Sequence, residues 1–129
     1  MGMFDAVKNA YYHYFTLKGR ATRSEYWWFW LYQSLGYIVI VAACIATSVT
    51  FQDDEGLSFI LVGIFGIFHV IPNFTILVRR LHDSSKSGWW VLLLLLSGPG
   101  ALILFIFTLL PSELDNKYGM NPHNIKCNL

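Results

Sequence analysis

Residues 79–90, RRLHDSSKSGWW, separate two strongly apolar segments with charged and turn-forming residues and end on two tryptophans. The flanking residues 57–78 and 89–110 are each long enough to cross a membrane, because about 20 apolar residues span a hydrocarbon core of ~30 Å. Residues 27–49 form another stretch of that length without a charged residue. The sequence therefore predicts an all-α membrane protein with three transmembrane helices.

The composition also indicates a membrane protein built as one domain. Hydrophobic residues make up 55% of the 129 residues and charged residues only 13%, against roughly 25% charged residues in ordinary soluble domains. We therefore treat residues 1–129 as a single polytopic domain. A cytoplasmic or interfacial segment at residues 1–25 precedes the first span, and a polar tail at residues 111–129 follows the third.

Basic residues are unevenly distributed among the segments that join the spans. Four precede the first span and three lie in residues 79–88, whereas residues 51–56, FQDDEG, carry three acidic residues and no basic one. Lys and Arg in short loops accumulate on the cytoplasmic side of a membrane. The pattern predicts a cytoplasmic N-terminus, a cytoplasmic loop at residues 79–88 and an acidic loop that faces the opposite side.

The third apolar segment is interrupted at Gly98-Pro99-Gly100. A proline inside a helix cannot donate the hydrogen bond to the residue four positions earlier, and its ring clashes there. A single kinked span of 22 residues, ~33 Å long at 1.5 Å per residue, would leave the tail outside. A re-entrant hairpin of two short arms would return the tail to the cytoplasm, provided that its irregular backbone is buried or hydrated. We favour the single kinked span.

Apolar and aromatic residues recur at close to helical spacing in the first 25 residues: Phe4, Val7, Tyr11, Tyr14 and Phe15. Basic residues accompany this stripe, as they do in helices that lie in the headgroup plane of a membrane. The sequence therefore predicts an amphipathic interfacial helix before the first span. Aromatic residues at 26–30 and 89–90 mark the levels at which the first and third spans enter the membrane.

Charged side chains gather at the predicted cytoplasmic face. The candidate residues are Arg20, Arg23, Glu25, Arg79, Arg80, His82 and Asp83. Guanidinium groups suit phosphate, which they bind bidentately, and anionic headgroups attract a basic residue near the surface by ~1 kcal/mol. Three interpretations remain open: the arginines only enforce topology, they bind anionic lipid, or they pair with the carboxylates and clamp the first two spans together.

His69 and Asn73 are polar residues within the second span, four positions apart and so on one helical face, with Pro72 between them. An ionisable residue in a span is a candidate functional residue, and the pair could line an ion or proton path. His and Asn also form hydrogen bonds between helices within membranes. We favour this second use, without excluding the first.

No catalytic, metal or cofactor site is predicted. His82 beside Asp83 could act as a general base, but adjacent residues rarely pair on a helix, and Asp83 also suits a turn. His123 and Cys127 supply only two of the four ligands that zinc usually takes. We therefore expect no enzyme, no bound metal, no cofactor and no nucleic-acid partner.

Three motifs follow one another along the chain. They are GRATRSEYWWF at residues 19–29, RRLHD followed by SGWW within residues 79–90, and NKYGMNP at residues 116–122. Together they resemble the YhaH-type inner-membrane proteins, domain-of-unknown-function family 805, over residues 15–122. The family tends to have Thr-Gly-Arg where this chain has residues 84–86, and Asp where Asn121 stands. The resemblance implies a small, multi-pass bacterial inner-membrane protein and no established activity.

These observations lead to one functional hypothesis and one alternative. The first is a non-enzymatic accessory or interaction protein, whose paired Arg, Glu and Asp residues clamp the helices at the cytoplasmic face. At least one arginine would then remain for an anionic phospholipid headgroup or a membrane-protein partner. The alternative is an oligomeric transporter or channel component for ions or small solutes that uses His69 and Asn73. A homo-oligomer is compatible with either function.

Overall fold

The computed structural model describes residues 2–51 and 55–125, and within these ranges it is helical with no β-strand. The helices are α1 (Met3–Tyr12), α2 (Arg23–Phe51), α3 (Glu55–Asp83), the 3₁₀ helix η1 (Gly88–Leu96), α4 (Gly98–Leu109) and the short α5 (Pro122–Ile125). The prediction of an all-α chain is therefore confirmed for the described residues. Asp53 and Asp54 of the predicted acidic loop lie outside them, as does Cys127.

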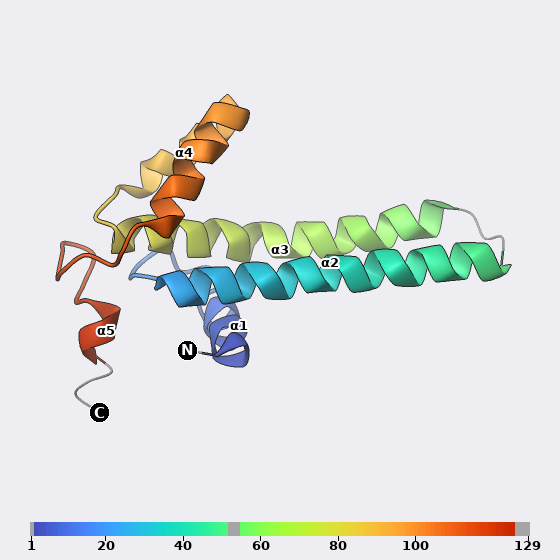
Figure 1. The fold of residues 1–129 in the computed structure, drawn as a ribbon, viewed down its shortest axis with the longest axis horizontal. Helices are drawn as coiled ribbons and strands as arrows, with labels where there is room; N and C mark the ends of the chain where they lie inside the picture. Colours follow the sequence, from blue (N-terminus) through green and yellow to red (C-terminus); the bar gives the residue numbers. More distant parts are fainter. Residues whose placement is uncertain (1, 52–54, 126–129) are drawn as a thin grey trace.

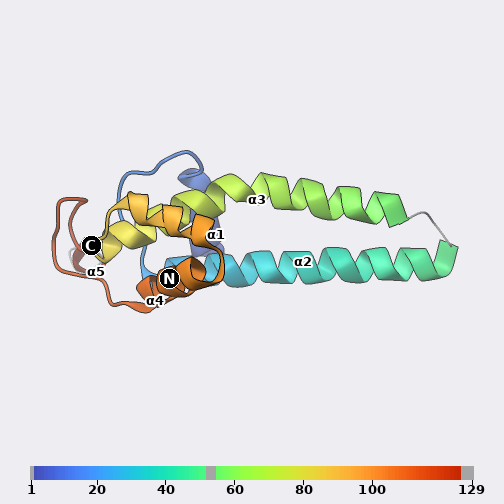
Figure 2. The same ribbon diagram turned by 90° about the horizontal axis from the view of Figure 1, so that it is seen from above.

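The two long helices α2 and α3 run side by side in opposite directions (Figures 1 and 2). Each has 29 residues and is therefore ~44 Å long at 1.5 Å per residue. Residues 23–47 and 56–83 have the length and composition of membrane-crossing helices. Apolar side chains such as Ile38, Ile45 and Ile67 are exposed on these helices, as they are on helices that face lipid.

The motif RRLHD forms the last turns of α3, and not the loop predicted from its charges. Arginine and leucine are good helix formers, and the charged side chains of this motif are buried against other segments. The helix ends just before Ser85, whose φ of 55° takes the chain out of the helical region. The connection to η1 is therefore only residues 84–87.

The third apolar segment does not form the single kinked span that we favoured. It folds into two short helices, η1 and α4, which lie side by side (Figure 1). The rings of Trp90 and Phe107, one from each arm, have centroids 5.4 Å apart. A Cβ atom on Gly100 would collide with the carbonyl oxygen of Leu93, so the turn requires glycine at this close approach.

Pro99 explains why the segment reverses. It occupies the first turn of α4, where the missing N–H would have no intrahelical partner in any case and the fixed φ suits a helix start. The proline thus begins a new helix instead of kinking a continuous one. The arms are each ~18 Å long, from nine residues at ~2.0 Å and twelve at ~1.5 Å. Neither arm has the length of a ~30 Å span.

The N-terminal helix α1 is shorter than the predicted segment of residues 1–25, because it covers only Met3–Tyr12. Its buried residues are Ala6 and Ala10, and Val7 and Tyr11 pack against a core cluster that includes Phe29. These two members of the predicted stripe contact the protein, whereas Phe4 and Phe15 are exposed. The position of α1 at a membrane surface remains a prediction.

The tightest packing lies at the end of the molecule where α3 finishes. One core cluster joins α1, α2 and α3 through Ala10, Ala21, Phe29 and Ile76. A second joins α3 to both arms of the hairpin through Val78, Leu81, Val91 and Leu104. The charged motifs therefore lie where α1, α2, α3, η1 and α4 meet, and the far halves of α2 and α3 extend beyond this packed end (Figure 1).

Candidate functional site

The guanidinium group of Arg20 lies at the centre of the packed end, with a side chain only 2% exposed. Its Nε donates to Asp83 Oδ1 at 2.9 Å, and Nη2 donates to the Asp83 carbonyl oxygen at 3.1 Å. The other acceptors are the tail carbonyl oxygens of Glu113, Leu114 and Gly119. A guanidinium group has five N–H donors, and all five are used here. Arg20 therefore attaches the tail to the end of α3.

Arg80 is the second buried arginine, and it holds the end of the hairpin. Its Nε donates to the carbonyl oxygen of Thr108 at 3.1 Å, and its Nη2 donates to that of Leu110. Both carbonyls belong to the end of α4, where backbone acceptors lack intrahelical donors and a positive charge is favoured. Arg80 also pairs with Asp83, one turn further along α3. The return arm of the hairpin is thereby fixed beside α3.

Asp83 is the carboxylate that these groups share. It is fully buried and forms ion pairs with Arg20 and Arg80. Its Oδ2 also accepts a hydrogen bond from the Ser112 hydroxyl, and its carbonyl oxygen accepts from the Glu113 N–H at 3.1 Å. Burial of an unpaired carboxylate would cost several kcal/mol. The surrounding donors offset that cost and bring three segments together: the segment before α2, the end of α3 and the tail.

Arg79 and Glu25 form a separate ion pair, with Nη1 and Oε1 3.1 Å apart, between the end of α3 and the start of α2. Arg79 Nη2 also donates to the Arg20 carbonyl oxygen at 3.3 Å. Arg23 differs from the other arginines, because it is exposed and its hydrogen bond within the described ranges is a long one of 3.5 Å to the Leu109 carbonyl oxygen. We refer to Arg20, Glu25, Arg79, Arg80 and Asp83 as the arginine cluster.

The tail completes this end of the molecule with residues that the sequence analysis did not select. The Asn116 side chain donates to the His82 carbonyl oxygen and to the Ser85 hydroxyl, each at 3.0 Å. The ring of Tyr118 stacks on the His82 imidazole with centroids 3.9 Å apart. Gly119 has a φ of 135°, which favours glycine. The NKYG motif was visible in the sequence, but nothing in its spacing indicated these contacts.

The arrangement limits what the cluster can bind. The donors of Arg20 are saturated, and those of Arg79 and Arg80 point mainly at carboxylates and carbonyl oxygens within the protein. These three guanidinium groups therefore hold segments of the chain together and do not offer a pair of N–H donors to an external phosphate. His82 and Asp83 do not form a dyad, because Asp83 faces Arg20 whereas His82 Nδ1 faces the Gly19 carbonyl oxygen at 3.3 Å.

His69 lies in an aromatic enclosure between α1, α2 and α3. Its Nδ1 is 2.8 Å from the Phe65 carbonyl oxygen, which can only accept, so Nδ1 carries the proton. Its Nε2 accordingly accepts from the Tyr11 hydroxyl at 2.9 Å. Burial and the hydroxyl of Tyr32 raise the pKa of Tyr11 well above its usual range, so the phenol stays protonated. Both ring nitrogens of His69 are therefore occupied.

Pro72 leaves a backbone carbonyl oxygen of α3 without its helical hydrogen-bond donor in the same region. Because proline has no N–H, the carbonyl oxygen of Phe68, four residues earlier, loses its helical donor. The Tyr14 hydroxyl, which lies just beyond α1, donates to this oxygen at 2.7 Å. The segment after α1 thus satisfies the backbone group that Pro72 leaves open in α3.

Asn73 has different surroundings from His69. It lines a cavity of about 360 Å³ between α2 and α3, whose other walls are Tyr26, Trp30, Gln33, Ser34, Tyr37 and Leu77. The Oε1 atom of Gln33 is buried there without a hydrogen-bond partner in the described part of the chain. His69 is one turn away from Asn73 but does not line this cavity.

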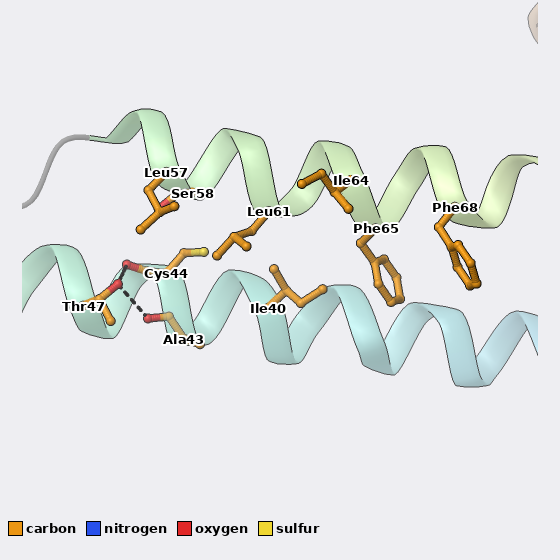
Figure 3. Close-up of a pocket in the computed structure, with 10 residues that line it drawn as sticks. All are labelled: Ile40, Ala43, Cys44, Thr47, Leu57, Ser58, Leu61, Ile64, Phe65 and Phe68. Carbon is orange, nitrogen blue, oxygen red and sulfur yellow. Dashed lines mark hydrogen bonds between the residues drawn. The ribbon is translucent and has the colours of Figure 1, made fainter.

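A larger cavity of about 530 Å³ separates α2 and α3 farther from the arginine cluster (Figure 3). Ten residues line it: Ile40, Ala43, Cys44, Thr47, Leu57, Ser58, Leu61, Ile64, Phe65 and Phe68. The Thr47 hydroxyl turns back to the carbonyl oxygens of Ala43 and Cys44. The walls are therefore mainly apolar, as in a surface for packing lipid chains or helices.

Comparisons with known proteins agree with the motifs. The family model described as "Protein of unknown function (DUF805)" matches residues 14–120. The inner membrane protein YhaH of Escherichia coli K12 is 34% identical over 113 residues, covering 85% of this chain and 89% of that protein. The inner membrane protein YhaI of the same strain is 32% identical over 113 residues, covering 85% and 88%. No solved structure shows a significant match.

Arg20→Lys should release the tail. Lysine keeps the positive charge but has three donors, so at least two of the five hydrogen bonds are lost. Hydrogen bonds from charged groups contribute ~1.5–3 kcal/mol each, and we expect the tail to lose about 3 kcal/mol of docking free energy. Trypsin cleavage after the exposed Lys117 should then accelerate by roughly tenfold or more. Arg23→Lys is the control and should leave the rate unchanged; equal rates in both variants would refute the assigned role of Arg20.

Tyr14→Phe should destabilise the protein by about 1 kcal/mol, because the Phe68 carbonyl oxygen loses its donor. In a Pro72→Ala background the new backbone N–H can serve that oxygen, so the same substitution should cost less. Equilibrium unfolding in mixed detergent measures both differences. Tyr12→Phe, at an exposed position, is the matched control. Equal costs of Tyr14→Phe in the two backgrounds would show that Pro72 does not create the need for Tyr14.

Proposed function

The chain belongs to the DUF805 family of proteins of unknown function, and we propose that it is a non-enzymatic accessory protein of the bacterial inner membrane. Its relatives are inner membrane proteins, and two of its helices are long and apolar enough to cross a membrane. The arginine cluster carries the proposal, because its ion pairs and carbonyl contacts join four segments of the chain instead of facing outward. Such a cluster suits a rigid platform that holds interaction surfaces.

In this proposal α2 and α3 cross the membrane, and the N-terminus and the tail both lie in the cytoplasm. The helices are ~44 Å long, about 14 Å more than the hydrocarbon core requires. The additional length places the arginine cluster at the headgroup level, outside the hydrocarbon core. The hairpin of η1 and α4, with arms of ~18 Å, then enters only the cytoplasmic leaflet. The exposed Phe4 and Phe15 favour a position for α1 at the same surface.

Lipid contact in this proposal is made by a set of exposed cations that surround the arginine cluster. We call Lys8, Lys18, Arg23 and Lys117 the cation rim. They belong to α1, the segment after it, the start of α2 and the tail, all of which meet at the packed end. Each basic residue near an anionic surface contributes ~1 kcal/mol. The rim would attract anionic phospholipids or an acidic surface of a membrane protein.

The transporter alternative is supported less well. Its clearest feature is the cavity beside Asn73, where Gln33 Oε1 is buried without a partner. His69 is enclosed by aromatic rings and already bonded through both nitrogens. A proton or ion path through His69 would therefore require α1 to move away.

Thiol labelling tests the proposed orientation. In a Cys44→Ser, Cys127→Ser background, we expect a membrane-impermeant maleimide to label Asp54→Cys in intact spheroplasts. Lys18→Cys and Lys117→Cys should react only after lysis, because the hairpin returns the tail to the N-terminal side. Labelling of Lys117→Cys from outside would require a third crossing and would contradict this arrangement.

Lipid competition tests the cation rim. Phosphatidylmethanol is anionic and phosphatidylcholine is zwitterionic, and neither headgroup donates a hydrogen bond. Native mass spectrometry should show preferential retention of phosphatidylmethanol, and replacement of all four rim residues by Gln should reduce the preference by roughly tenfold or more. A control with Lys8→Arg, Lys18→Arg, Arg23→Lys and Lys117→Arg should retain it. An undiminished preference in the Gln variant would exclude the rim as the lipid contact.

A further inference from the structure

A cavity of about 390 Å³ lies beside the arginine cluster, between the end of α3, the start of η1 and the docked tail. Its volume falls within the range of ~300–1,000 Å³ that is usual for small-molecule sites. Its lining includes the apolar side chains of Leu17, Phe74, Trp89 and Leu92, together with His82 and Ser87. The cavity is therefore mostly apolar, with a few polar groups in its lining.

His82 is the polar side chain whose bonding is incomplete at this cavity. It is only 9% exposed, and its Nδ1 must carry a proton because its neighbour at 3.3 Å is the Gly19 carbonyl oxygen. In the neutral imidazole, Nε2 is then a hydrogen-bond acceptor. No hydrogen bond to this atom is formed within residues 2–51 and 55–125.

Two neighbours hold this acceptor in place at the cavity wall. Tyr118 stacks on the imidazole with an interplanar angle of 7° and so fixes the plane of the ring. Gly88 also lines the cavity, and a Cβ atom there would lie 3.3 Å from Nε2 and 3.0 Å from a methyl carbon of Val78. Glycine at this position keeps η1 close to α3 and leaves Nε2 uncovered.

Ser87 supplies a second polar group. Its hydroxyl oxygen accepts a long hydrogen bond of 3.4 Å from the Trp89 N–H, so the hydroxyl proton remains available to donate. The cavity thus offers one fixed acceptor, His82 Nε2, and one adaptable hydroxyl. A matching ligand has a hydrogen-bond donor on an otherwise apolar body.

The rim of the cavity indicates the source of that ligand. Leu17, Phe74, Trp89 and Leu92 line the cavity and are also exposed. Phe74 follows the exposed Val70 and Ile71 along α3, so the cavity is continuous with the apolar surface of a helix that is long enough to cross a membrane. A ligand would enter along this surface, which favours a lipid over a water-soluble metabolite.

We propose that this cavity binds one phospholipid whose acyl chain lies along Phe74, Trp89 and Leu92 and whose headgroup donates a hydrogen bond to His82 Nε2. The inference rests on the membrane placement given under Proposed function, but not on the cation rim. It predicts that hydrogen-bond donation by the headgroup, and not its charge, determines the preference. Hydroxyl and ammonium headgroups share this chemistry.

The test uses lipids that are matched in charge. Phosphatidylglycerol and phosphatidylmethanol with identical acyl chains carry the same charge, but only phosphatidylglycerol has headgroup hydroxyls. When the full-length protein in detergent receives equal amounts of both, native mass spectra should show about fivefold more bound phosphatidylglycerol, the effect expected of one neutral hydrogen bond. Phosphatidylethanolamine and phosphatidylcholine form a second pair without net charge, and the ammonium lipid should be preferred.

Leu92→Trp places a larger side chain in the cavity wall at a position that is already 50% exposed, and it should abolish the preference. Leu95→Trp lies on the same helix, 83% exposed and away from the lining residues, and should preserve it. Equal binding of the two lipids by the wild-type protein would overturn the proposal, whatever the folding of the variants. So would an unchanged preference in a folded Leu92→Trp protein.

The result is independent of the cation rim. Because the paired lipids have equal charge, rim electrostatics cannot produce a preference between them. The variant with Gln at all four rim positions should therefore retain the preference for phosphatidylglycerol over phosphatidylmethanol. Loss of anionic selectivity with retention of this preference would support both sites, whereas loss of both in the Gln variant would show that the rim produces both effects and would overturn the cavity site.

Discussion

The buried carboxylate of Asp83 is the constraint on which the packed end of this protein depends. A charge removed from water costs several kcal/mol unless ion pairs and hydrogen bonds replace its hydration. Here Arg20 and Arg80 provide the opposite charge, and the Ser112 hydroxyl provides a further donor. These groups come from the segment before α2, from α3 itself and from the tail. These groups are far apart along the chain, so the carboxylate obtains its ion pairs and hydrogen bonds only when the segments have assembled.

The same electrostatic demand explains why arginine is used at these positions. A lysine has three donors on one atom, whereas the planar guanidinium group of Arg20 reaches five acceptors in different directions. Most of those acceptors are carbonyl oxygens of residues 113–119, an irregular part of the tail. Arg20 therefore holds this irregular backbone against the end of α3.

The sequence was sufficient for the all-α class and for the two long helices, because hydropathy and length depend on local composition. It also selected every member of the arginine cluster. It failed at Pro99, since a proline within an apolar segment is compatible with either a kink or a helix start, and the packing of one arm on the other, such as Trp90 on Phe107, distinguishes them. The carbonyl partners of Arg20 were likewise unpredictable, because no periodicity relates residue 20 to residues 113–119.

In the last turn of α3, neighbouring residues have different roles. One holds chain segments together, and the other faces the proposed lipid site. Consecutive residues on an α-helix point about 100° apart, and the side chains of His82 and Asp83 accordingly face different partners. Asp83 faces the arginines that hold the segments together, and His82 faces the docked tail and the cavity beside η1. His82 and Asp83, which suggest a catalytic dyad in the sequence, thus belong to different sites: Asp83 to the arginine cluster and His82 to the candidate lipid site. Because Asn116 bonds the His82 backbone and Tyr118 stacks on its ring, the tail held by Arg20 also fixes the imidazole. The arginine cluster therefore positions the His82 imidazole, which we propose binds the lipid headgroup.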